Sequence, residues 1–297
     1  MYECVQVGKD TFFMDCPSRV GIFRDGDAAW LIDSGSDKDA AKKVLGILSE
    51  LGLRLEAAIV THFHADHTGG AALLQQRTGC RLLLAEPTAP GAFPEINTAL
   101  LYGAHPPKPL KGKFFLAQSA RYEAAENADL PEGMLLTRLD GHAFAMLGVR
   151  TRDQVWFIGD SVASEHTFEK YKLTYLYDVE KFLQSLDTVA SLEGKLFVPA
   201  HVAPFERAED IVERNRRWVY ETGDFLTELL KTPLTFESLL KRVFDQYALQ
   251  MTFGQHTLLG ATVRAFLTWL MDAGRVSYFC EDNLLYWKAA EQDAEGR

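Results

Sequence analysis

The sequence is poor in cysteine and has no long apolar run. Its 297 residues include four cysteines, none of them in a C-x-x-C pair: Cys4, Cys16, Cys80 and Cys280. This spacing suggests no disulfide framework, so we expect a reducing, cytoplasmic compartment. No stretch approaches the roughly 18 consecutive apolar residues of a membrane-spanning helix. The first residues are strand-like and charged, unlike a signal peptide, and we expect no membrane partner.

Positive charge is also scarce. Lys and Arg number 31 against 41 Asp and Glu, which gives a formal net charge of -10. An acidic chain repels nucleic-acid phosphates unless its basic residues are gathered in one patch. The balance therefore disfavours nucleic acid and favours a small-molecule substrate. The 47% of apolar and 24% of charged residues exclude a disordered or collagen-like chain.

Strand and helix patterns alternate along the first two thirds of the chain. Residues 19–25 and 28–32 predict a hairpin, and residues 37–52 predict a helix capped by Ser36 or Asp37. Further strands are predicted at 57–61, 81–85, 135–139, 143–150, 154–158 and 195–198, and further helices at 69–78 and 178–192. Residues 86–133 break the pattern, since they hold seven of the eleven prolines but keep their aromatic residues. We expect them to form a packed, lid-like insert.

The C-terminal part is expected to form a small separate domain. Helices are predicted at 206–230, 236–248 and 256–273, followed by a hairpin at 275–280 and 284–288. We therefore predict a catalytic domain at residues 1–205 and a helical, winged-helix-like domain at 206–297.

This appendage lacks the signature of a DNA reader. Its last helix has one basic residue, Arg264, and residues 226–288 hold six basic and six acidic side chains. A DNA-reading helix normally presents several basic or amide side chains on one face. We expect the domain to pack, shape the pocket or mediate a homodimer.

The strongest chemical signal follows the strand predicted at 57–61. The segment from His62 to His67 reads HFHADH and places four candidate metal ligands within six positions. In an extended segment His62 and His64 point to the same side, and a turn brings Asp66 and His67 to a neighbouring position. Imidazole and carboxylate groups suit zinc, and also manganese or iron. We therefore predict a metal site here.

This segment resembles the H-x-H-x-D-H signature of the metallo-β-lactamase-fold hydrolases. The remaining ligands of that family are a His, an Asp and a His, each at the end of a later strand. The chain offers His142, Asp160 and His201 in that order, each just past an apolar run. The resemblance covers about residues 1–205. It implies an α/β fold, a four-layer αββα sandwich.

The resemblance also implies a dinuclear site. The first metal would be bound by His62, His64 and His142, the second by Asp66, His67 and His201, with Asp160 bridging both. Zinc is the favoured ion, with iron or manganese as alternatives. A hydroxide between ions about 3.5–4 Å apart would attack the ester, thioester or lactone group of a small substrate. Asp66 would act as the catalytic residue that orients the hydroxide.

Two departures from the family pattern disfavour particular activities. Position 160 is Asp rather than the Cys of one β-lactamase class, which disfavours antibiotic hydrolysis. Position 64 is His rather than the Glu of flavodiiron sites, which disfavours reduction of oxygen or nitric oxide. Two alternatives stay open: an RNA-cleaving nuclease of the same fold, and a sulfur dioxygenase with one iron. A DNA-binding regulator is disfavoured by the intact ligand set.

Residues around the motif receive weaker assignments. Asp33 is expected to support the site from below, and Gly69 and Gly70 to allow close packing at a helix start. His166 is expected at the surface. The remaining candidates for substrate contact are Tyr102, His105, Tyr171, Tyr175 and Tyr177, although packing is the favoured role of the last three.

Overall fold

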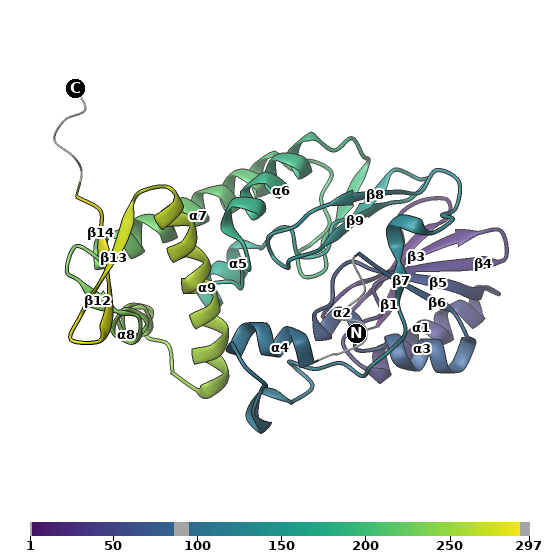
Figure 1. Ribbon diagram of the computed structural model, residues 1–297. Coiled ribbons are helices and arrows are strands. Elements are labelled where there is room, and N and C mark those ends of the chain that lie inside the picture. The colour runs from purple at the N-terminus through teal and green to yellow at the C-terminus, as the bar shows by residue number, and fades with distance from the viewer. Residues whose placement is uncertain (1, 86–94, 292–297) are drawn as a thin grey trace.

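The computed structural model describes residues 2–85 and 95–291. The start of the predicted lid, with Pro87, Pro90, Phe93 and Pro94, lies outside the described residues. Two sheets lie face to face, with α1 (Lys38–Glu50) and α3 (Ala71–Thr78) outside the first and α6 (Val179–Ser191) outside the second (Figure 1). The predicted four-layer αββα sandwich is confirmed.

The first sheet carries its strands in chain order. They are β1 (Glu3–Gln6), β2 (Thr11–Asp15), β3 (Val20–Asp25), β4 (Ala28–Ile32), β5 (Arg54–Val60), β6 (Arg81–Leu84) and β7 (Glu123–Ala124). β1 to β4 are antiparallel, and β4 to β7 are parallel. α1 and α3 form the crossovers that parallel pairing requires. α1 begins after Asp37, whose carboxylate accepts hydrogen bonds from the backbone N–H groups of Asp39 and Ala40.

The second sheet has the order β11-β10-β9-β8. Its strands are β8 (Leu135–Arg138), β9 (Leu147–Arg150), β10 (Val155–Phe157) and β11 (Leu196–Val198). The strand predicted at 143–150 begins only at Leu147. The backbone N–H of Met146 donates to the carboxylate of Asp140 at 2.9 Å, so this side chain holds the preceding residues in a loop. The helices α5 (Glu165–Tyr171) and α6 lie between β10 and β11 in the sequence.

Alternating side chains fill both faces of the first sheet. In β2, Phe12 and Met14 belong to the cluster under α1 and α3, whereas Phe13 faces the second sheet. In β4, Leu31 belongs to the cluster under α1 and α3, and Trp30 faces the second sheet. This period of two is the reason that one strand can serve two apolar layers.

The predicted insert contains regular structure. It holds the helix α4 (Glu95–Tyr102), the 3₁₀ turns η1 (Lys108–Leu110) and η2 (Ala125–Asn127), and the strand β7, which extends the first sheet. Tyr102 at the end of α4 contacts Phe253, with ring centroids 5.9 Å apart. The insert therefore reaches the C-terminal helices.

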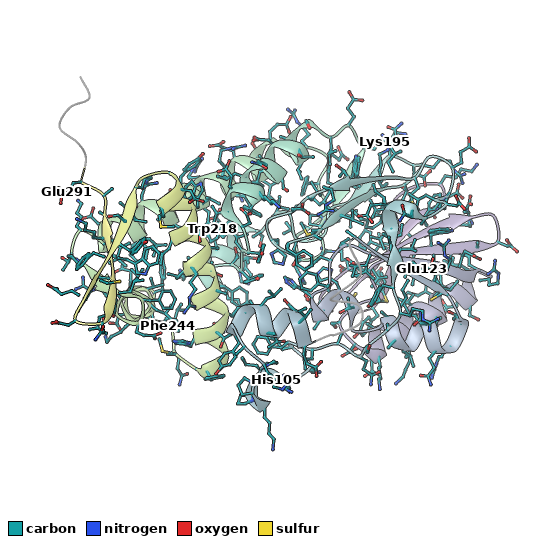
Figure 2. All side chains as sticks on the ribbon, in the orientation of Figure 1. His105, Glu123, Lys195, Trp218, Phe244 and Glu291 are labelled. Atoms are coloured by element: carbon teal, nitrogen blue, oxygen red, sulfur yellow. The ribbon has the colours of Figure 1, made fainter. Side chains whose placement is uncertain are left out.

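The C-terminal part is built from helices and a small sheet. Its elements are α7 (Glu209–Leu229), β12 (Leu234–Thr235), α8 (Phe236–Gln246), α9 (Phe253–Asp272), β13 (Val276–Glu281) and β14 (Leu284–Ala289). Trp218 and Phe244 (Figure 2) share one hydrophobic cluster with Leu186 of α6. Since this cluster is continuous across residue 205, the division of the chain there stays a prediction. No helix in the described ranges has the length and hydropathy needed to cross a membrane.

Candidate metal centre

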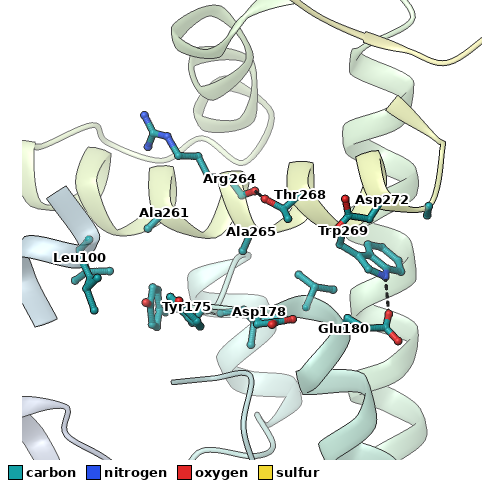
Figure 3. A pocket seen from close by; sticks show the side chains of 15 residues that line it. Leu100, Tyr175, Asp178, Glu180, Ala261, Arg264, Ala265, Thr268, Trp269 and Asp272 are labelled. Carbon is teal, nitrogen blue, oxygen red and sulfur yellow. Dashed lines mark hydrogen bonds between the residues drawn. The ribbon is translucent and has the colours of Figure 1, made fainter. Parts of the chain in front are cut away.

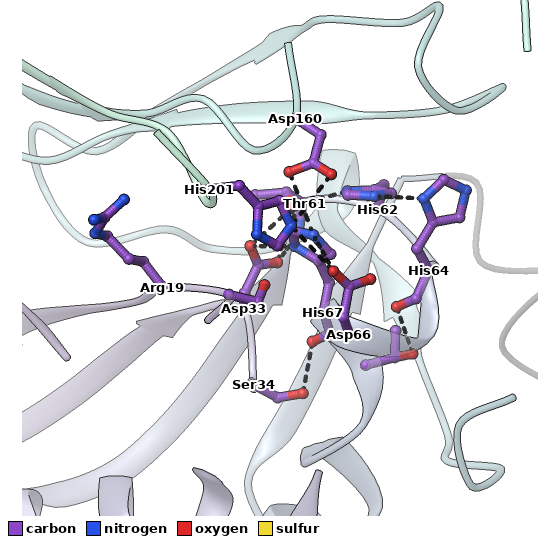
Figure 4. Close-up of polar contacts among 12 residues, drawn as sticks. Arg19, Asp33, Ser34, Thr61, His62, His64, Asp66, His67, Asp160 and His201 are labelled. Carbon is purple, nitrogen blue, oxygen red and sulfur yellow. Dashed lines mark hydrogen bonds and ion pairs between the residues drawn. The ribbon is translucent and has the colours of Figure 1, made fainter. Parts of the chain in front are cut away.

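The predicted ligands lie beyond the carboxyl ends of strands from both sheets. His62 lies two residues past β5, and Asp160 and His201 lie three residues past β10 and β11. His142 lies in the loop between β8 and β9. Because β10 and β11 are parallel, their carboxyl ends share one edge of the sheet. Figure 4 shows Asp160 and His201 there, facing the histidines that follow β5.

A short helix turns the motif back on itself. This helix, α2 (Ala65–Thr68), carries Asp66 and His67, and the backbone N–H of His67 donates to the carbonyl of His64 at 3.0 Å. The predicted close packing at the glycines that follow is confirmed. A Cβ at Gly70 would lie 2.2 Å from the carbonyl oxygen of Ser34, so only glycine fits without a shift.

The imidazoles of His62, His64 and His142 converge on one point. His62 Nε2 lies 2.9 Å and His142 Nε2 lies 3.0 Å from the same atom, His64 Nδ1. The facing atoms of the three rings all lie within 4.8 Å of one another. This spacing is close enough for one ion to contact all three rings.

Asp66, His67 and His201 form a second group of facing atoms within 4.8 Å. His201 Nε2 lies 3.0 Å and His67 Nε2 lies 3.7 Å from Asp66 Oδ2. Asp160 lies between the two groups, with Oδ2 3.3 Å from His142 Nε2 and 3.5 Å from His201 Nε2. The structure thus brings all seven predicted residues together, while their roles as ligands stay a prediction.

Oxygen atoms outside the cluster fix three of the rings by hydrogen bonds to Nδ1. The contacts are His67 with Asp33 Oδ2 at 2.9 Å, His142 with the carbonyl of Tyr175 at 3.1 Å, and His201 with the carbonyl of Pro17 at 2.6 Å. A ring that donates from Nδ1 presents the lone pair of Nε2 on its other side. These three Nε2 atoms are the ones that face the cluster. Asp33 lies under the site, as Figure 4 shows.

Burial keeps the first group neutral. It lowers the pKa of His142, lowers the pKa of His64 to about 3, and holds the pKa of His62 well below its usual value. Neighbouring imidazoles lower the pKa of His62 and His64 further. A neutral imidazole is the form that binds a metal ion.

In the second group, neighbouring carboxylates raise the pKa values of the histidines. Burial alone would lower the pKa of His67, but Asp33 and Asp66 raise it well above its usual value. Asp160 raises the pKa of His201 to about 9. Although burial opposes it, His201 and His67 hold the pKa of Asp160 well below its usual range. A field that retains protons on two histidines also favours a bound cation.

Two buried atoms that face this site have no hydrogen-bond partner in the described part of the chain. They are His67 Nε2 and Asp160 Oδ1, which lie 3.5 Å apart. Buried polar atoms rarely lack partners, and an ion bound between them is one accepted reason. Five imidazoles and two carboxylates also form a donor set suited to zinc, iron or manganese. The residues therefore fit divalent metal ions.

Sequence patterns did not identify Arg19, which holds the loop around His201. Its guanidinium donates to the carbonyls of Pro199 and Val202, and its backbone N–H donates to the carbonyl of Ala200 at 3.1 Å. Asp15 orients the guanidinium at 2.9 Å. No local motif marks such an arginine, because its partners are distant in sequence.

A cavity of about 360 Å³ opens over the cluster. Its lining includes His142, Asp160 and His201, together with His166 and Tyr175. His166 is exposed on α5 and forms part of this wall.

Two candidate substrate-contacting residues in the insert lie elsewhere. Tyr102 contacts Phe253, and His105 Nε2 lies 3.0 Å from Lys111 Nζ. Neither residue lines the cavity over the cluster.

Known proteins with similar sequences match part of this chain. Hydroxyacylglutathione hydrolase of Albidiferax ferrireducens is 41% identical over 63 residues, which are 21% of this chain and 23% of that protein. Atrochrysone carboxyl ACP thioesterase of Aspergillus fumigatus is 26% identical over 200 residues, 65% of this chain and 53% of that protein. The chain thus spans about a quarter and about half of the length of these curated relatives.

Solved structures share the fold over nearly the whole chain. A metallo-beta-lactamase family protein from Thermus thermophilus has a TM-score of 0.68 at 19% identity, covering 96% of this chain and 97% of that one. A beta-lactamase domain protein from Burkholderia ambifaria has a TM-score of 0.72 at 18% identity, covering 97% and 94%. A sequence profile of the Metallo-beta-lactamase superfamily matches residues 14–201. The chain belongs to the metallo-beta-lactamase superfamily.

Proposed function

We propose that this protein hydrolyses thioesters, with carboxylic esters and lactones as chemically related substrates. The observation that carries the proposal is the convergence of five imidazoles and two carboxylates on one cleft, with Asp160 between the two groups. Two divalent ions, for which zinc is our expectation, would be held by His62, His64 and His142 and by Asp66, His67 and His201, with Asp160 shared.

The names of the relatives favour sulfur as the leaving atom. One relative is named for a hydroxyacylglutathione, in which an acyl group is joined to sulfur, and another is named a thioesterase. Both names describe hydrolytic reactions, and the fold alone does not determine which substrate is cleaved.

The protein groups position the reaction. When bound, the metal ions supply a hydroxide at neutral pH and polarise the substrate carbonyl. Burial would raise the pKa of Asp66, but His67 and His201 hold it below its usual range, so this side chain remains a carboxylate. Its partly exposed oxygen can accept a hydrogen bond from the attacking water and orient it.

Asp160 does not supply the proton that a leaving group would need. Asp160 is the carboxyl group that lines the cavity in the described part of the chain, and its pKa lies below the usual range. It therefore cannot donate a proton at neutral pH. A thiol has an ordinary pKa of about 8.5, so a thiolate departs more readily than an alkoxide or an amine anion, each of which needs a proton from another group.

The test is a substrate screen on zinc-loaded protein. The substrates are butanoyl N-acetylcysteamine, ethyl butanoate, a γ-lactone, bis-p-nitrophenyl phosphate and single-stranded RNA. We expect the thioester to give the highest kcat/KM, with activity lost in Asp160→Ala and kept in Asp187→Ala, an exposed control. Cleavage of RNA or the phosphodiester with an inert thioester would overturn the proposal.

A further inference from the structure

A second hollow of about 670 Å³ lies beside the cavity over the cluster. It runs between α4 of the insert, the start of α6, and α9 of the C-terminal part (Figure 3). We call it the α4–α9 groove. Its main lining residues are Leu100, Tyr175, Val179, Ala261, Ala265 and Trp269.

The groove adjoins the metal centre through Tyr175. This residue and Leu176 line both the groove and the cavity over the cluster. The ring centroid of Tyr175 lies 5.4 Å from that of His64 and 5.7 Å from that of His142. If the carbonyl group of a substrate reacts at the cluster, the rest of the substrate can reach the groove by passing the ring of Tyr175.

The walls of the groove suit an apolar chain of limited length. Leu100 is 52% exposed, and its side chain borders the groove across from the small side chains of Ala261 and Ala265 (Figure 3). At the end away from Tyr175, Trp269 Nε1 donates to Glu180 Oε2 at 3.2 Å. This hydrogen bond ties α9 to α6 and bounds the groove.

Charge at the rim excludes polyanions. Asp178, Glu180 and Asp272 line the groove, and the cation among its lining residues, Arg264, stacks on Phe236 at 3.7 Å from the ring centroid. Three carboxylates against one arginine repel the phosphates of nucleotides or RNA. An uncharged hydrocarbon chain meets no such penalty and removes Leu100 from water.

We propose that the α4–α9 groove binds the acyl chain of the substrate. The substrate class is then a medium-chain acyl thioester, whose chain passes Tyr175 and ends near Trp269. This inference rests on the proposed function, because it places the reacting thioester at the metal cluster. It assigns the insert and the C-terminal helices a shared role in selecting chain length.

The test compares acetyl, butanoyl, octanoyl and hexadecanoyl N-acetylcysteamine thioesters in the zinc-loaded full chain. Burial of each added methylene should raise kcat/KM by about fourfold until the groove is full, so we expect a maximum at medium length. Leu100→Asp should lower the octanoyl-to-acetyl ratio of kcat/KM at least about tenfold, because it places a charge beside the chain. Thr268→Trp, at an exposed position of the lining, should move the maximum to shorter chains.

Matched controls change the same residue types elsewhere. Leu284→Asp alters a leucine that is 49% exposed on the C-terminal hairpin. Thr188→Trp alters a threonine of α6 that, like Thr268, donates to the carbonyl four residues earlier. Both controls should keep the wild-type ratio.

A binding measurement separates the two proposals. The probe is S-octyl N-acetylcysteamine, a thioether that cannot be hydrolysed, titrated by calorimetry into wild type and Leu100→Asp. Weaker binding to the variant supports the groove even if no thioester is hydrolysed, and the proposed function alone would then fail. Hydrolysis without chain-length preference, or equal binding to wild type and variant, overturns the groove and leaves the proposed function standing.

Discussion

The guanidinium of Arg19 donates to the carbonyl oxygen of Val202, the residue that follows His201, across 183 positions of sequence. The segment before β3 thereby holds the loop that presents His201 to Asp66 and Asp160. His201 Nδ1 also forms a hydrogen bond with the carbonyl oxygen of Pro17, two residues before Arg19. The position of one predicted ligand is set by residues that lie outside the motif.

Arg19→Ala should selectively lower the metal affinity of the second proposed site, which includes His201. Loss of the guanidinium frees the carbonyls around His201, and removal of such supporting contacts typically costs about 10- to 100-fold in metal affinity. Zinc titration of the metal-free protein should show one tight and one weakened site. Arg24→Ala, at the other end of β3 and paired with Asp10, serves as the control. Equal weakening of both sites would show that Arg19 acts only on global stability.

Asp33→Asn should leave the ring of His67 less firmly oriented. The carboxylate of Asp33 accepts from His67 Nδ1 and also from the backbone N–H of Thr61 at 2.7 Å. An amide can present either its oxygen or its NH₂ group to His67, so it no longer fixes the proton on Nδ1. We expect zinc affinity to fall by about 10- to 100-fold. Competition with a chromophoric chelator measures the zinc affinity. An unchanged affinity would show that Asp33 does not support the site.

Phe266→Ala should destabilise the whole chain. Phe266 is fully buried in the cluster that joins α6 to the C-terminal helices, with Trp218 5.9 Å away between ring centroids. Truncation of a buried phenylalanine costs about 3–5 kcal/mol. Thermal unfolding should keep one transition, moved to lower temperature, whereas Phe114→Ala at a 70% exposed position should have little effect. Two transitions, of which only one moves, would show that the parts unfold independently.

Asp10 should contribute to stability only above acidic pH. Its pKa is lowered first by hydrogen bonding to Arg24, at 2.8 Å, with a further contact to Arg152. A carboxyl group with a lower pKa in the folded state stabilises it above the unfolded pKa, and that gain is lost as pH falls through the folded pKa. For this surface pair the gain is about 1 kcal/mol or less. Asp10→Asn should therefore cost stability in urea at pH 7 and little at pH 2, and an equal cost at both would contradict the account.

The fold was predictable where periodic patterns are long. The hairpin of β3 and β4, the Asp37 cap of α1 and the helix α6 follow directly from alternation, capping and amphipathic spacing. Three short helices were missed: α2, α4 and α5. α4 and α5 have eight and seven residues, too few for a clear period, and their position depends on tertiary contacts such as that of Tyr102 with Phe253.

The candidate site was predictable where residues are adjacent or follow strands. The HFHADH segment is visible in the sequence as it stands, and His142, Asp160 and His201 could be chosen because each follows an apolar run. Arg19 could not be chosen, since only folding brings it to Val202. The α4–α9 groove likewise joins an insert helix to a C-terminal helix, and no local pattern in either predicts that they meet.

The most direct test of the central claim is elemental analysis of the purified chain, set beside the same measurement on His64→Ala and Asp160→Ala. The account predicts two divalent metal ions per chain in the wild type, fewer in each variant, an unchanged far-ultraviolet circular dichroism spectrum, and loss of thioester hydrolysis after chelation. A single iron per chain with thiol-dependent oxygen uptake, or full hydrolytic activity in metal-stripped protein, would contradict it.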